Sequence, residues 1–155
     1  MTRCFHLEGG PLNDPLRSVE KGIRILPPFD TPIGRVGLTI CFDLRFPEIS
    51  LALKRQNSQI ITYPSAFTVP TGQAHWETLL RARAIETQAY VIAAAQVGAH
   101  NQKRASYGHS MIVSPWGEVL AELGGDGQET QIATAEIDLG LVERVRREMP
   151  LLRRT

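Results

Sequence analysis

The strongest constraint on the fold is an amphipathic helix that runs directly into a short apolar strand. The helix is predicted over residues 74–88, where apolar side chains recur at helical spacing and Glu77 stands four residues before Arg81, as a helical ion pair requires. Residues 91–96 are small and almost entirely apolar, which is typical of a strand covered on both faces. A helix followed by such a strand indicates layers of helices packed on a sheet.

The other predicted elements follow the same α/β pattern. Apolar and small residues alternate along residues 36–41, which predicts a strand that ends at Cys41, and Pro47 begins a helix that runs to about residue 56. Further strands are expected at residues 60–63, 110–113, 119–122 and 131–137, a last helix at 139–147, and loops at 9–32 and 65–73.

The order of these elements predicts an α/β layer architecture with a mixed sheet. At 155 residues and 43% apolar composition, the chain is long enough for one sizeable core and too short for two, so residues 1–155 form one domain or part of one. Two cysteines without metal-ligand spacing fit neither a zinc site nor a disulfide framework, and they favour a reducing compartment.

The charge balance and the hydropathy restrict the kind of partner. A net charge of +1 gives no field that attracts nucleic acid or an anionic membrane, and the arginines near the C-terminus are interpreted as a solvated helix face. No apolar run approaches the roughly 20 residues of a transmembrane helix, and residues 1–10 lack the core of a signal peptide. We therefore expect a small-molecule or protein partner and a cytoplasmic location, with mitochondria as the alternative.

Cys41 is the candidate nucleophile. A thiol at the end of a buried strand, just before a turn, lies where α/β folds place a nucleophile, because the turn exposes the side chain and presents the next backbone N–H to an anion. A buried cysteine can equally be a packing residue. The following segment to Glu48 adds two acids and Arg45, more charge than a core strand requires, and we expect Arg45 and Glu48 to pair as scaffolding.

The segment from Pro32 to Glu48 resembles the cysteine motif of the nitrilase superfamily of carbon-nitrogen hydrolases. The Nit branch, with its deaminated glutathione amidases and its fusions to a fragile histidine triad domain, carries similar motifs in the same order at residues 63–67, 75–77, 81–86, 107–110 and 115–117. The resemblance covers residues 31–147, most of the chain.

The resemblance implies a nitrilase-like α-β-β-α sandwich and a Glu-Lys-Cys triad without metal or organic cofactor. Cys41 would attack a small omega-amide such as deaminated glutathione and form a thioester, while the lysine and the backbone N–H of Phe42 hold the oxyanion. The substrate pocket is predicted at four consecutive residues: Ser65, Ala66, Phe67 and Thr68.

The N-terminal part departs from the family pattern. The glutamate base lies far upstream in the family, and Met1 falls at the position of the lysine, so we expect the N-terminal half of the sandwich to be missing and the isolated chain to be inactive. Glu8 matches a second glutamate of the family, which orients the site, or is an ordinary loop carboxylate. Lys21 and Lys54 are interpreted as solvated surface residues.

Two other functions stay open. The chain could be a non-catalytic binding or regulatory partner of an intact nitrilase subunit, because an incomplete sandwich leaves apolar faces uncovered. It could also be an unrelated thiol hydrolase that pairs Cys41 with His75 or His109, although both histidines are better explained as hydrogen-bonded structural residues. Since the family uses the helix at residues 74–88 for subunit association, a homodimer is also expected.

Overall fold

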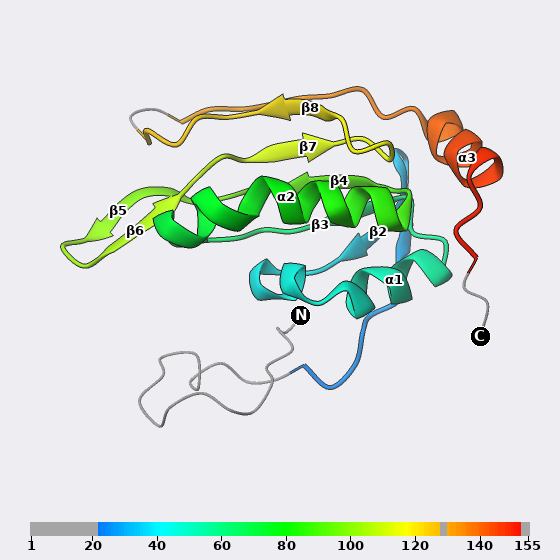
Figure 1. Cartoon of the computed structure of the whole chain (residues 1–155), viewed down its shortest axis with the longest axis horizontal. Coiled ribbons are helices and arrows are strands. Elements are labelled where there is room, and N and C mark those ends of the chain that lie inside the picture. Colours follow the sequence, from blue (N-terminus) through cyan, green and yellow to red (C-terminus); the bar gives the residue numbers. More distant parts are fainter. Residues whose placement is uncertain (1–21, 128–129, 153–155) are drawn as a thin grey trace.

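A mixed sheet of six strands organises the molecule (Figure 1). The computed structural model describes residues 22–127 and 130–152. In those residues the sheet has the order β1-β2-β3-β4-β7-β8, and β5 and β6 form a separate hairpin. The strands are β1 (Phe29–Thr31), β2 (Gly34–Leu38), β3 (Ile60–Thr62), β4 (Tyr90–Ala93), β5 (Val97–Asn101), β6 (Arg104–Tyr107), β7 (Met111–Val113) and β8 (Val119–Glu122). The helices are the 3-10 helix η2 (Cys41–Arg45), α1 (Pro47–Arg55), α2 (Val69–Thr87) and α3 (Leu139–Glu148).

The centre of the sheet is parallel and its flanks are antiparallel. Strands β2, β3 and β4 run parallel, with α1 crossing from β2 to β3 and α2 from β3 to β4. The pairs β1–β2, β4–β7 and β7–β8 are antiparallel. This arrangement confirms the predicted α/β class and the mixed sheet.

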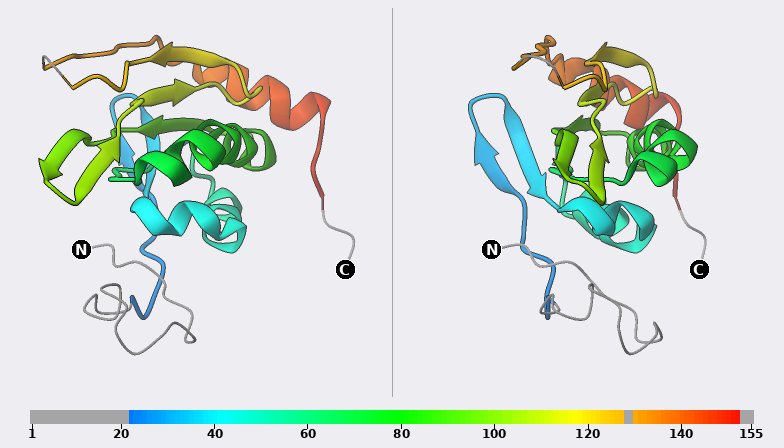
Figure 2. Two further views of the ribbon diagram at one scale, coloured as in Figure 1. Left: turned by 60° about the vertical axis from the view of Figure 1, so that its left-hand side comes forward. Right: turned by 90° about the vertical axis from the view of Figure 1, so that its left-hand side faces the viewer.

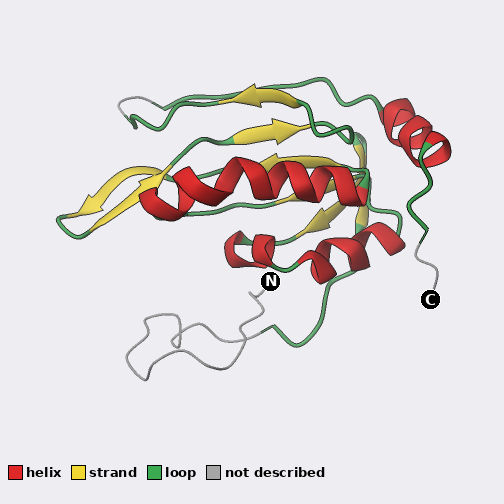
Figure 3. Ribbon diagram, in the orientation of Figure 1, coloured by secondary structure: helices red, strands yellow, loops and turns green. Residues whose placement is uncertain are grey.

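The main core lies between the sheet and helices α1 and α2, which cover the same face (Figures 1 and 3). Leu53 of α1 and Leu80 of α2 are fully buried against Ile61 and Val91 of the central strands. Ile61 and Val91 face one another across the β3–β4 ladder. Burial of large apolar side chains of this kind stabilises the fold by about 1.5–3 kcal/mol each.

The opposite face of the sheet is covered only in part. Val142 of α3 packs there on Val36, Ile60 and Tyr90. Away from α3, Leu38 on β2 and Leu120 on β8 are each 38% exposed. An apolar side of the sheet therefore remains accessible within the described part of the chain.

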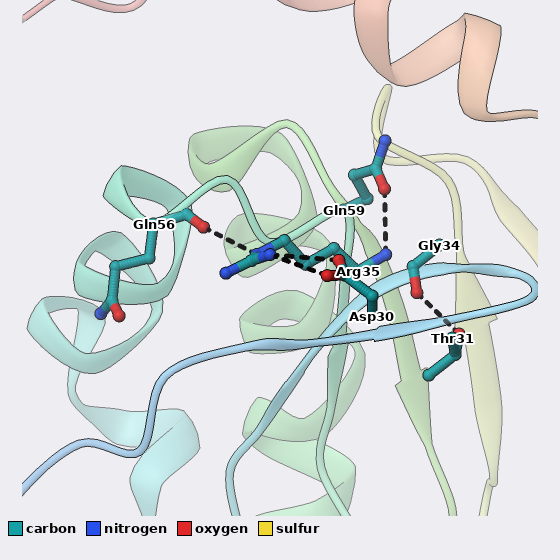
Figure 4. Close-up of polar contacts among 6 residues, drawn as sticks. All are labelled: Asp30, Thr31, Gly34, Arg35, Gln56 and Gln59. Atoms are coloured by element: carbon teal, nitrogen blue, oxygen red, sulfur yellow. Dashed lines mark hydrogen bonds and ion pairs between the residues drawn. The ribbon is translucent and has the colours of Figure 1, made fainter.

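Polar contacts fix the β1–β2 hairpin to the rest of the sheet (Figure 4). Arg35 donates to both carboxylate oxygens of Asp30, its cross-strand partner, at 3.1 and 3.2 Å, and its Nε donates to the carbonyl of Gln56. The backbone N–H of Arg35 donates to Oε1 of Gln59 at 2.9 Å. The hairpin forms one edge of the sheet and stands apart from α2 (Figure 2).

The structure extends α2 beyond its predicted start. The helix begins at Val69 rather than at residue 74, because Pro70 lies in the first turn, where its missing N–H is tolerated. Gly72, which also favoured a loop, lets the helix approach Tyr107; a Cβ there would stand 2.2 Å from that ring. Both residues that indicated a loop are thus compatible with a helix that packs closely on β6.

The observed strands differ from the sequence predictions in three places. Part of the predicted loop at residues 9–32 is β1, whose sequence has no strand pattern and is ordered by pairing with β2. Residues 131–137 alternate in burial but form no strand in the described chain, since they join no ladder. The β5–β6 hairpin was not predicted, because its sequence lacks the regular alternation of large apolar and polar residues that marks a strand. In the described residues, no helix has the length and apolar composition to cross a membrane.

Candidate active site

Cys41 lies beyond the carboxyl end of β2, at the edge of the parallel part of the sheet. The strand ends at Leu38, three residues earlier than predicted, but the chain continues beside β3: Thr39 N–H donates to the Thr62 carbonyl at 3.2 Å, and Cys41 N–H to the Pro64 carbonyl at 2.9 Å. Cys41 then begins the turn η2. Ligand sites of open α/β sheets lie outside the carboxyl ends of such strands.

The backbone of Cys41 is held in an unusual conformation. Its φ is +42°, in the left-handed region that costs a non-glycine residue about 1–3 kcal/mol. Within η2, which Cys41 begins, the Asp43 carboxylate accepts a hydrogen bond from the Ile40 N–H at 2.9 Å, and Asp43 is only 2% exposed. Strained residues persist where the surroundings fix them, and they cluster at functional sites.

Arg83 connects the cysteine turn to α2. It is 5% exposed, and its Nε donates to the carbonyl of Leu44 in η2 at 3.0 Å. Its Nη1 forms an ion pair with Glu86 at 2.8 Å. Burial raises the pKa of Glu86, and the positive charge of Arg83 opposes that rise. A buried guanidinium thus anchors the segment that carries Cys41.

Arg45 does not pair with Glu48, contrary to the prediction. Its guanidinium lies 5.2 Å from the ring centroid of Phe67 and 5.9 Å from that of Phe42, and Nη1 is 3.3 Å from Nδ1 of His75. The contacts with Phe42 and Phe67 are cation–π interactions, and the hydrogen bond with His75 joins η2 to the N-terminal part of α2.

A cavity of about 550 Å³ opens beside the half-buried thiol of Cys41. Of the four predicted pocket residues, Ser65 and Ala66 line it. Its complete lining is Ile40, Cys41, Pro64, Ser65, Ala66, Ala94, Ala95, Gln96 and Ser110. Within the described residues, this lining contains no carboxylate, lysine or histidine that could take the thiol proton.

The remaining predicted site residues lie elsewhere. Phe67 is 7% exposed and packs on Trp76 with ring centroids 4.8 Å apart, in the main core. Thr68 precedes α2, and its hydroxyl is 2.8 Å from that of Thr71. Phe42 is the second residue of η2, so its amide lies in the first turn directly after Cys41. Glu8 lies outside the described residues.

Sequence reasoning missed the part of the wall that follows β4. Ala94, Ala95 and Gln96 come directly after this strand, and Ser110 directly precedes β7. The signal was present, because the carboxyl ends of neighbouring parallel strands meet at one edge of a sheet.

Both candidate histidines are hydrogen-bonded, as predicted. His75 contacts Arg45, and Nδ1 of His109 lies 2.8 Å from Oε1 of Glu122. Neither lines the Cys41 cavity. Among the described residues, no group of three or more His, Cys, Asp and Glu side chains could hold a metal ion.

Two basic residues interpreted as solvated are instead held by the fold. Lys54 donates through Nζ to the carbonyl of Glu86 and to Oε1 of Gln88, and burial lowers its pKa. Arg146 donates through Nη2 to the Ser58 carbonyl at 2.6 Å. Each side chain donates a hydrogen bond to a backbone carbonyl near the end of a helix, and the sequence alone does not show such a contact. Lys21 lies outside the described residues.

Comparison with known proteins places these features in a family. The carbon-nitrogen hydrolase family model matches residues 6–147. The chain is 57% identical over 125 residues to the deaminated glutathione amidase of Homo sapiens, covering 80% of this chain and 37% of that protein.

Two solved structures share the fold. The nitrilase and fragile histidine triad fusion protein NitFhit of C. elegans matches with a TM-score of 0.85 and 51% identity, covering 95% of this chain and 36% of that one. A mutant amidase from Nesterenkonia, with an acetamide moiety covalently added at its active-site cysteine, matches with a TM-score of 0.64 and 27% identity, covering 70% and 40%. The chain spans about half or less of the length of the curated relatives that it matches, from 28% to 54%.

Proposed function

Because the chain belongs to the carbon-nitrogen hydrolase family, we propose that it is the nucleophile-bearing part of an amidase that acts on a small omega-amide such as deaminated glutathione. The observation that carries this proposal is the thiol of Cys41, held at a positive φ and facing a cavity. The human relative's name and the acetamide adduct on the cysteine of the Nesterenkonia amidase support the same chemistry.

In the proposed reaction, the Cys41 sulfur attacks the amide carbonyl carbon. The new C–S bond moves the carbonyl electrons onto oxygen, which the amide of Phe42 stabilises as a hydrogen-bond donor. Collapse of this intermediate breaks the C–N bond, and the nitrogen leaves as an amine or as ammonia after it takes up a proton. Water then hydrolyses the thioester and restores the thiol.

Acid–base groups from outside the described residues must complete this site. The Cys41 cavity has no carboxylate or lysine in its described lining, and acyl transfer needs a group that accepts the thiol proton. We assign these roles to the glutamate and lysine that the family resemblance implies, with Glu8 as the orienting carboxylate. The isolated chain is then expected to be inactive.

One observation favours a second function, that of a non-catalytic partner of an intact nitrilase subunit. The sheet face that carries Leu38 and Leu120 is only partly covered, and an accessible apolar face of this kind marks an interaction surface. The expected homodimer would use a different apolar surface, on α2 and the neighbouring turn. There Ile85 is 43% exposed and Trp116 is 63% exposed.

The catalytic proposal is tested by extending the chain with the N-terminal half of the human amidase. We expect this chimera to release ammonia from a small omega-amide and the Cys41→Ala variant to lose at least about 1,000-fold in kcat, because no other nucleophile replaces the thiol. Cys41→Ser serves as the matched control for folding. Hydrolysis that survives Cys41→Ala would contradict the assignment, whereas an intact chimera without turnover would favour the partner function.

A further inference from the structure

A second cavity of about 400 Å³ adjoins the Cys41 cavity. Both are lined by Ala95, Gln96 and Ser110, so these residues form a wall that the two cavities share. Beyond the shared wall, the second cavity reaches His109 and Gly124. Gln96, three residues after the end of β4, therefore belongs to the walls of both cavities.

The backbone of His109 singles out the same region. Four non-glycine residues of the described chain have a positive φ. Asn57 and Gln88 follow α1 and α2, where a left-handed residue commonly ends a helix. Cys41 and His109, with φ of +42° and +60°, end no helix, and each lines one of the two adjoining cavities. Strain is therefore concentrated at the walls of this double cavity.

Several contacts keep His109 in place. The indole Nε1 of Trp76 donates to the His109 carbonyl at 2.7 Å, and the imidazole stacks on Tyr107 with ring centroids 4.1 Å apart. Its Nδ1 is bound to Glu122. These contacts form a rigid wall, which is what a binding subsite requires.

Gln96 is the group in the shared wall that is available to a ligand. The hydroxyl of Ser110 is occupied, since it accepts from the Ala95 N–H at 2.9 Å and lies 3.3 Å from the Ala95 carbonyl. Gln96 is exposed, and within the described chain its side-chain amide forms no hydrogen bond. It offers one N–H donor and one carbonyl acceptor side by side, the complement of a peptide group.

We propose that Gln96 recognises a peptide group in an amide substrate whose reacting carbonyl lies at Cys41 and whose remote part enters the second cavity. This rests on the proposed function and narrows its substrate class to amides longer than a simple monoamide. No Asp, Glu, Lys or Arg of the described residues lines either cavity, so the contact proposed here is a hydrogen bond to a neutral peptide group and not an ion pair with a described side chain.

Thiol-directed probes test this on the chain as it is. Chloroacetamide carries no tail, N-(chloroacetyl)glycinamide carries a peptide group, and N-butylchloroacetamide carries an apolar tail of similar length. In each case the Cys41 sulfur forms a bond to the methylene carbon, chloride leaves with the bonding electrons, and the thiol proton passes to solvent. Mass spectrometry of the Cys41 peptide gives the alkylation rate against probe concentration, separately from Cys4.

We expect the glycinamide probe to reach half-maximal rate at a concentration about 3- to 10-fold lower than the butyl probe, the effect of one or two neutral hydrogen bonds. Gln96→Ala should remove this difference, with the rate of each tailed probe compared with the chloroacetamide rate of the same variant. Gln102→Ala, in the turn between β5 and β6, is the matched control and should retain the difference. Because the Gln96 side chain forms no intramolecular bond, its variants should fold, which circular dichroism checks.

The other outcomes overturn the proposal at distinguishable levels. If the glycinamide and butyl probes reach half-maximal rate at the same concentration, or if their difference persists in Gln96→Ala, recognition by Gln96 is excluded. The proposal that Cys41 is a reactive thiol is not affected by that result. A Cys41 that chloroacetamide does not alkylate in the folded chain overturns the proposed function and this subsite together, because the thiol is then closed to any substrate.

Discussion

Replacing Arg83 with Met tests whether a buried guanidinium holds the cysteine turn. The change keeps a long apolar side chain on α2 but removes the hydrogen bond to the Leu44 carbonyl and the ion pair with Glu86. Losing a charged hydrogen bond costs about 1.5–3 kcal/mol, and breaking a fully buried ion pair costs about 3–5 kcal/mol. Since the Glu86 side chain is 31% exposed and water reaches it, we expect a loss of about 2–3 kcal/mol.

Urea unfolding followed by circular dichroism measures this loss. Arg81→Met is the control on the same helix, because the pair of Arg81 with Glu77 is about half exposed on both sides and should contribute less than about 1 kcal/mol. The double variant Arg83→Met with Glu86→Gln should recover about 1 kcal/mol, as it leaves no carboxylate without a partner. Equal losses for Arg83→Met and Arg81→Met would refute the anchoring role of Arg83.

The pH dependence of the stability loss in Arg83→Met gives an independent test of the contact between Arg83 and Glu86. Burial already raises the pKa of Glu86, and removal of Arg83 should raise this pKa further. A carboxyl group whose folded pKa exceeds its unfolded value binds its proton more tightly in the folded state, so the stability it contributes is lost as pH rises through that range. The deficit of Arg83→Met should therefore be smaller at acidic pH and grow toward neutral pH, and a deficit independent of pH would contradict this account.

Two further predictions concern the fold. Burial raises the pKa of Tyr63 to about 12, so folding stability should fall by up to about 1.4 kcal/mol per pH unit between pH 10 and 12, and Tyr63→Phe should lack that slope in alkaline urea titrations. Arg146→Ala should lower the free energy of unfolding in urea by about 2–3 kcal/mol, because the Arg146 guanidinium donates to the Ser58 and Gln88 carbonyls. The control Arg144→Ala, at an exposed ion pair, should lower it by less than about 1 kcal/mol. Similar losses for both variants would contradict this prediction.

Sequence reasoning identified the site mainly through Cys41 and the residues that follow β3. Ser65 and Ala66 could be placed beside the thiol because the carboxyl ends of adjacent parallel strands share one edge. Phe67 could not be separated from them, since burial in the core depends on its contact with Trp76. Gln96 was missed although its place at the end of a predicted strand was a signal, because the sequence does not show that this strand pairs with β3.

Local chemistry in the sequence determined the α/β class, the family resemblance and the choice of Cys41 as the candidate nucleophile. Helical spacing, strand alternation and a cysteine before a turn are short-range patterns, and each constrains the backbone without distant contacts. Only the tertiary structure decided that Arg83 donates to the Leu44 carbonyl, that Arg146 donates to the Ser58 carbonyl, and that Gln96 lines two cavities. These contacts join residues between 39 and 88 positions apart or depend on the order of strands, and such pairings follow from the packing of whole layers rather than from any local pattern.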